Sequence, residues 1–130
     1  MNRQSLLAPF IASALFLGLS GTASAQDIPE LTKCMKGANN DSAMVACNAK
    51  ELKVQDARLN KAYQAVINFE EGEKKQQLQD VQRLWIKYRD ANCGFMGSAS
   101  GGTIDRVNGV ACRVDMTQTR AAELESLLPL

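Results

Sequence analysis

One stretch of the sequence, residues 78–93, narrows the choice of fold more than any other. It carries the single Trp of the chain, Trp85, one of its two Tyr residues and one of its four Cys residues. Large apolar side chains recur in it and just beyond it at steps of three, four or seven: Leu78, Val81, Trp85, Tyr88 and Phe95. Such steps place residues on one side of an α-helix. The stretch therefore predicts an amphipathic helix, and its two aromatic rings are expected to sit at the centre of a small core.

The first 25 residues have the pattern of a secretory signal peptide. Arg3 supplies positive charge, residues 6–19 are almost wholly apolar, and small side chains at Ala23 and Ala25 suit a signal peptidase. A retained membrane anchor is the alternative, but the apolar run is shorter than the roughly 20 residues that a spanning helix needs. No Cys adjoins the cleavage site, which argues against a lipid anchor. We expect cleavage after Ala25 and a mature domain of residues 26–130 in the periplasm or outside the cell, with no segment inserted in a membrane.

The charge of the mature domain excludes some classes of partner. The chain has 15 basic and 14 acidic residues, and Arg3 is the only charged residue of the signal peptide, so 14 of each sign remain. A neutral surface exerts no long-range attraction on nucleic acid or on anionic lipid. No nucleic-acid partner is expected.

The four cysteines, Cys34, Cys47, Cys93 and Cys112, all lie in the exported part of the chain. An even number of Cys residues in a small exported domain predicts disulfides, here two. The alternative, a metal site, lacks both a CxxC pair and any His residue to complete a zinc centre. We therefore expect no metal and no other cofactor.

Hydrophobic periodicity predicts three long helices. A short helix is expected within residues 26–37, and a long one then runs to Phe69 from a cap at Asn40, Asp41 or Ser42. The helix around Trp85 is expected from about residue 73 to residue 93 or a little beyond.

A Gly/Ser-rich loop, residues 97–109, separates this helix from the last one, which is expected to begin between Val110 and Asp115 and to stop at Pro129. The predicted fold class is all-α: a small, disulfide-stapled helical bundle of three main helices, with a long Gly-rich loop before the last helix.

The expected register of the two long helices places certain polar residues opposite each other. A short turn near residue 72 makes these helices antiparallel neighbours, so residues face each other when their numbers add up to about 145. Asp56 then faces Arg89 and Tyr63 faces Gln82, and with Trp85 these residues are predicted to form a structural clamp rather than a site of chemistry.

The same register bears on the disulfides. Cys47 and Cys93 would be offset by about 7.5 Å along the helix axes, outside the usual reach of a disulfide. This favours Cys34–Cys47 with Cys93–Cys112, although an error of one helical turn in the register would reopen the alternative.

The residue inventory gives no support for an enzyme. The chain has no His, which excludes Ser-His and Cys-His arrangements, and the Gly101-Gly102 pair lacks the Lys and Ser/Thr of a phosphate-binding loop. No catalytic residue is therefore assigned.

The sequence carries a recurrent set of motifs: LNxxY ending at Tyr63, QxxWIxYRDAxC from Gln82 to Cys93, and TxxR from Thr117. This set resembles the LprI-like family of small exported bacterial proteins, which is named for a lysozyme inhibitor. The resemblance covers about residues 34–128. It implies a protein-binding module with a protein partner, and a lysozyme-type muramidase is the partner that the family name suggests.

Two functions follow as hypotheses. In the first, the domain inhibits a muramidase through the loop of residues 98–108, whose candidate contact residues are Ser98, Ser100, Thr103, Asp105 and Arg106. In the second, the loop is a plain connection and the protein is a structural or stress-related component of the cell envelope with another binding partner. A Gly-rich loop loses entropy on docking, so the inhibitor hypothesis predicts micromolar rather than nanomolar binding.

Overall fold

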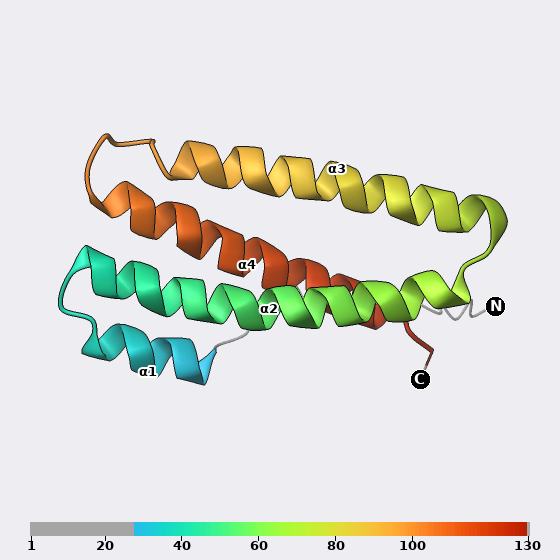
Figure 1. Cartoon of the computed structure of the whole chain (residues 1–130), viewed down its shortest axis with the longest axis horizontal. Coiled ribbons are helices and arrows are strands. Elements are labelled where there is room, and N and C mark those ends of the chain that lie inside the picture. Colours follow the sequence, from blue (N-terminus) through green and yellow to red (C-terminus); the bar gives the residue numbers. More distant parts are fainter. Residues whose placement is uncertain (1–27, 130) are drawn as a thin grey trace, which may run out of the picture.

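The computed structural model describes residues 28–129, and the predicted signal peptide lies outside these residues. Four helices follow one another: α1 (Pro29–Gly37), α2 (Asp41–Phe69), α3 (Gly72–Met96) and α4 (Ile104–Ser126). This confirms the all-α class, with three long helices and a short helix α1 that packs on α2 (Figure 1). None of the helices within the described residues is long and apolar enough to cross a membrane.

Local sequence signals fix the start of α2 and the turn after it. The side chain of Asn40 accepts a hydrogen bond from the backbone N–H of Ala43 at 2.9 Å, so Asn40 is the N-cap among the three predicted candidates. Helix α2 then runs without a break to Phe69, and a turn at Glu70 and Glu71 leads into α3. The short turn makes α2 and α3 antiparallel, as predicted.

Helix α4 is the central element of the bundle. It packs along α2 and also contacts α3, whereas α2 and α3 make little direct contact with each other. The apolar core consists of Leu59, Ala62 and Val66 of α2 with Ala121 and Leu124 of α4. The partly buried side chains packed against this core are Tyr63, Leu78, Trp85 and Leu128.

The prediction that the aromatic rings of α3 lie at the centre of the core is wrong in part. Trp85 does pack against the core, but the exposed fraction is 62% for Tyr88 and 69% for Phe95. The buried residues of α3 are Gln82 and Cys93. The physical reason is that α3 lies at the edge of the bundle and contacts mainly α4, so the rest of its circumference faces solvent (Figure 1).

The expected start of the last helix is also wrong. Helix α4 begins at Ile104, so Asp105 and Arg106 lie in its first turn and the loop is shorter than predicted. Val107 is buried and extends the inner stripe of α4 by two turns ahead of Val114. Gly109, which looked like a loop residue, is buried inside the helix.

Candidate functional site

The candidate site is the loop of residues 97–103 together with the first turn of α4. Asp105, in that first turn, is buried, and its carboxylate holds the loop. It accepts hydrogen bonds from the hydroxyl of Ser100 at 2.7 Å, from the backbone N–H of Gly101 at 2.7 Å and from the backbone N–H of Ser100 at 3.0 Å. The Ser100 hydroxyl and these N–H groups lower the pKa of Asp105 below its ordinary value. Gly101 has a φ of 74°, a conformation that few side chains tolerate, so the sequence suits this tight turn.

Two further contacts fix the loop to the body of the protein. The hydroxyl of Thr103 donates to the carboxylate of Asp41 at 2.6 Å and so ties the loop to the first residue of α2. On the other side, Gly109 of α4 approaches Gly97 so closely that a Cβ added at position 109 would lie 2.9 Å from the Cα of Gly97. The loop is therefore anchored to α2, to α3 and to α4.

The hydroxyl groups of the predicted contact residues all donate hydrogen bonds within the protein. Ser98 donates to the backbone carbonyls of Gly94 and Phe95 at the end of α3, and the hydroxyls of Ser100 and Thr103 bond as described above. These three hydroxyls therefore donate within the protein and can only accept hydrogen bonds from a partner.

Arg106, in the first turn of α4, differs from the polar residues of the adjoining loop. Its side chain is exposed, and no ion pair joins it to another residue within the described part of the chain. It borders a shallow depression of about 420 Å³ over the loop, which Gly97, Gly101 and Gly102 also line. The site therefore presents one cation beside an open backbone surface of fixed shape.

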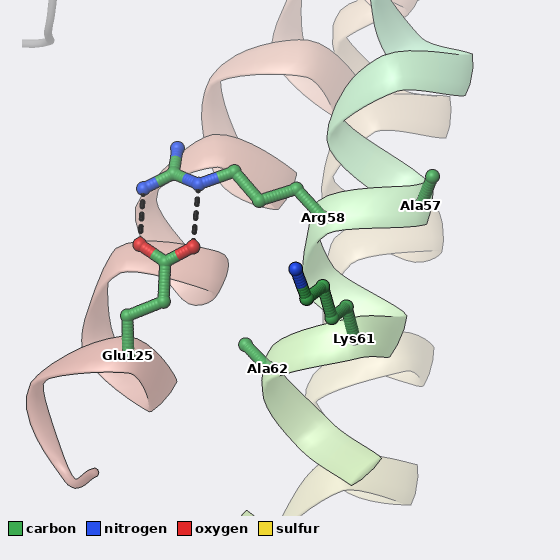
Figure 2. A pocket seen from close by; sticks show the side chains of 5 residues that line it. All are labelled: Ala57, Arg58, Lys61, Ala62 and Glu125. Carbon is green, nitrogen blue, oxygen red and sulfur yellow. Dashed lines mark hydrogen bonds and ion pairs between the residues drawn. The ribbon is translucent and has the colours of Figure 1, made fainter. Parts of the chain in front are cut away.

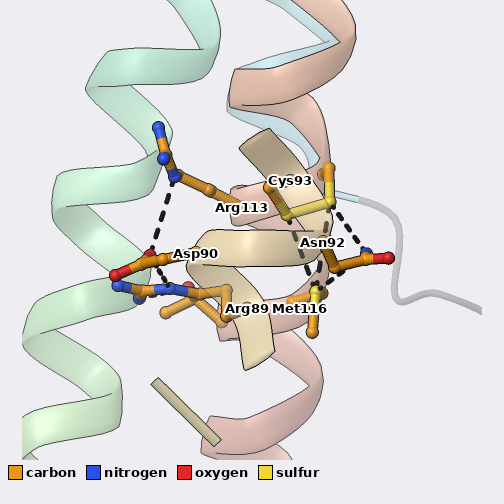
Figure 3. The surroundings of a disulfide bond; sticks show 8 residues. Arg89, Asp90, Asn92, Cys93, Arg113 and Met116 are labelled. Carbon is orange, nitrogen blue, oxygen red and sulfur yellow. Dashed lines mark hydrogen bonds and ion pairs between the residues drawn. A yellow bond between two sulfur atoms is a disulfide. The ribbon is translucent and has the colours of Figure 1, made fainter. Parts of the chain in front are cut away.

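A disulfide closes the base of this loop. The bonds join Cys34 to Cys47 and Cys93 to Cys112, the pairing that the register argument favoured. The Cys93–Cys112 bond links the end of α3 to α4 (Figure 3). The side-chain amide of Asn92 donates to the sulfur of Cys112 at 3.5 Å and to that of Met116 at 3.6 Å, and the Met116 sulfur lies 3.6 Å from that of Cys93. Beside it, the carboxylate of Asp90 pairs with Arg89 at 3.1 Å and with Arg113 at 3.8 Å.

The structure places the predicted clamp around Arg89. The guanidinium donates to the carboxylate of Asp56 at 3.3 Å and to the hydroxyl of Thr117 at 3.2 Å, and its Cζ lies 5.1 Å from the centre of the Trp85 ring. Arg89 thus joins α2, α3 and α4 at one point. The buried hydroxyl of Thr117 was missed as a partner, because the register argument considered only α2 and α3.

The second predicted pair is not formed. The side chain of Gln82 instead accepts a hydrogen bond from Arg120 at 3.1 Å, and Arg120 also pairs with Glu123 at 2.8 Å. Tyr63 packs against the apolar core. Because α4 lies between α2 and α3 at this level, a residue of α4 takes the place that the register gave to Tyr63.

An ion pair between α2 and α4 was also missed. The guanidinium of Arg58 donates to both carboxylate oxygens of Glu125, at 2.7 and 2.5 Å (Figure 2). This hydrogen bonding lowers the pKa of Glu125, and the charge of Lys61 acts in the same direction. Arg58, Lys61 and Glu125 line a hollow of about 490 Å³. Since Arg58 and Glu125 pair with each other across two helices, we assign this ion pair to the stability of the bundle.

The fold and the site together define a small, disulfide-stapled helical bundle that displays a fixed loop at one end. Within residues 28–129, no group of His, Cys, Asp and Glu side chains is arranged to hold a metal ion. The family model described as lysozyme inhibitor LprI matches residues 33–124. The chain belongs to the LprI family.

The chain is also similar to a bacterial protein over most of its length. The uncharacterized protein R02472 of Rhizobium meliloti (strain 1021) is 30% identical over 131 residues, which cover 90% of this chain and 94% of the relative. No solved structure matches the chain. The family is named for an inhibitor and not for an enzyme, which fits the expectation that this chain is not an enzyme.

Proposed function

We propose that this protein is an exported binding module that inhibits a lysozyme-type muramidase, and that the loop and Arg106 make the contact. The membership of the LprI family supports the class of activity. The observation that supports the site is the exposed Arg106 in the first turn of α4, which makes no ion pair within residues 28–129 and lies beside a loop held by Asp105 and Thr103. In this proposal, residues 1–25 direct export and are removed, and the mature domain acts in the periplasm or outside the cell.

The chemistry of the partner fits this site. A muramidase cleft carries catalytic carboxylates, and a guanidinium pairs with a carboxylate through two parallel hydrogen bonds. The buried Asp105 is directed at the loop backbone, so Arg106 meets the partner without a competing acidic side chain from its neighbour. A loop already fixed in shape also loses less entropy on docking than a free Gly-rich segment would.

The affinity expected from one cation on a neutral domain is still modest. The mature domain has no net charge to attract a basic enzyme over a distance, so its association is not accelerated by electrostatic steering. We therefore keep the expectation of micromolar inhibition.

The test measures the muramidase activity of lysozymes from several classes in the presence of the purified mature protein. We expect micromolar inhibition of at least one class, and a loss of about tenfold or more in the Arg106→Glu variant. The Lys53→Glu variant is the matched control, because Lys53 is an exposed cation on α2 and its reversal changes the net charge equally. If no class is inhibited, the inhibitor function is refuted. If both variants inhibit like the wild type, the loop is not the contact surface.

A further inference from the structure

Four of the exposed apolar side chains of α3 lie along one side of the helix and form an apolar stripe. The exposed fraction is 48% for Val81, 65% for Leu84 and 62% for Tyr88, and Phe95 continues the stripe towards the loop. These positions recur at steps of three, four and seven residues, so they share one side of the helix. An apolar stripe of this length on a soluble domain marks an interaction surface more often than a random surface does.

Charged side chains border the stripe in a self-complementary order. Asp80 and Lys87 are seven residues apart and therefore lie on the same edge of the stripe, with Leu84 between them along the helix. Asp80 has a side-chain exposure of 69% and pairs with Arg83 of its own helix at 3.0 Å, which leaves its carboxylate open to a second cation. Lys87 is exposed and makes no ion pair within the part of the chain that the structure describes.

A two-fold axis at Leu84 would place each of these side chains opposite a complementary side chain of the second copy. In an antiparallel pair of α3 helices, residues then face each other when their numbers add up to about 168. Leu84 meets the partner's Leu84, and Val81 meets the partner's Tyr88. At the edge, Asp80 meets the partner's Lys87, and symmetry repeats both contacts. The apolar residues and the opposite charges are thus apposed in the same register.

We propose that the α3 stripe binds a second copy of this chain, in an antiparallel two-fold dimer centred on Leu84. The mature domain has no net charge, so two copies do not repel each other over a distance. A contact along one helix buries less than the roughly 800 Å² per partner of a standard interface. The dimer is therefore expected to dissociate in the micromolar range or above.

The experiment measures the mass of the protein by sedimentation over a wide concentration range, using protein purified from the periplasm of cells that express the full chain. The wild type should pass from monomer to dimer as its concentration rises. Leu84→Glu should remain a monomer, because the symmetry axis brings two carboxylates together. Val54→Glu is the matched control, because Val54 is an exposed apolar residue on α2. It should dimerise like the wild type.

Charge reversal tests the register itself. Lys87→Asp and Asp80→Lys each place like charges opposite one another at two symmetric points, so each should weaken dimerisation about tenfold. The double variant Asp80→Lys/Lys87→Asp exchanges the two charges and should regain most of the wild-type affinity. Circular dichroism checks that each variant is folded.

Three results would overturn the proposal. The first is a wild type that stays monomeric at its highest soluble concentration, and the second is a dimer that Leu84→Glu does not weaken. The third is a double charge exchange that does not recover binding. None of these outcomes bears on muramidase inhibition, which the Arg106→Glu variant tests separately.

Discussion

Replacing Arg89 by Ala removes the contact point of three helices at once. Its guanidinium bonds to Asp56 at 3.3 Å and to Thr117 at 3.2 Å and lies over the ring of Trp85. These contacts differ in burial. The side chain of Arg89 is 16% exposed and that of Asp56 is 45% exposed, whereas Thr117 is fully buried.

The burial decides which contact matters most. The pair with Asp56 is partly solvated and is expected to contribute about 0.5–1 kcal/mol, and the contact with the Trp85 ring a similar amount. Removing the donor to the buried Thr117 hydroxyl costs about 1–3 kcal/mol. We therefore expect Arg89→Ala to lower the free energy of unfolding by about 2–5 kcal/mol, and Asp56→Ala by less than about 1 kcal/mol.

Urea unfolding of single and double variants measures these differences. Thr117→Val should cost much less in the Arg89→Ala background than in the wild type, because the hydroxyl has already lost its donor. Arg83→Ala is the matched control on the same helix. Its side chain is 69% exposed and, among residues 28–129, pairs only with Asp80, so the expected loss is below about 0.5 kcal/mol. Equal losses in Arg89→Ala and Arg83→Ala, or additive effects of Arg89→Ala and Thr117→Val, would refute the central role of Arg89.

Two further predictions concern the loop. The variant Cys93→Ala/Cys112→Ala should lose about 3 kcal/mol of unfolding free energy, because the bond joins positions 19 residues apart. A loss below about 1 kcal/mol in thermal unfolding would contradict this value. The depressed pKa of Asp105 predicts a pH dependence: its contribution to stability is present above its ordinary pKa of 3.8 and is lost as the pH falls through the lower, folded-state value. Asp105→Asn should therefore be less stable than the wild type at neutral pH, and the difference should close in acid. A difference that is constant with pH would argue against the bonded carboxylate.

The sequence predicted those features that depend on residues near each other along the chain. The break at Asn40 and the run without Gly or Pro to Phe69 define α2, and the short turn after it sets the direction of α3. The Asp56–Arg89 pair followed from that turn. It survives although α2 and α3 hardly touch, because the long side chain of Arg89 reaches across to α2.

The features that were not predicted depend on α4 being the central helix of the bundle, in contact with both α2 and α3. Periodicity shows that a helix has an apolar side but not how much of it a neighbour covers, so the exposure of Tyr88 could not be anticipated. Arg58 and Glu125 are 67 residues apart, and no local pattern relates them. Gly109 carried a weak signal for a turn, yet its role depends on Gly97, a residue of another element.

Gly97 and Gly109 meet backbone to backbone, so the shape of the loop does not depend on which side chains point outward from it. The main chains of α3 and α4 meet there directly, and Cys93–Cys112 joins the same two helices close by. The geometry of the loop is thus set by backbone contact, by one carboxylate and by one covalent bond. Ala99 and Arg106 take no part in these contacts, so substitutions there are expected to leave the shape of the loop unchanged. The bundle can thereby serve as a scaffold whose recognition properties change by substitution at a few exposed positions without refolding the loop.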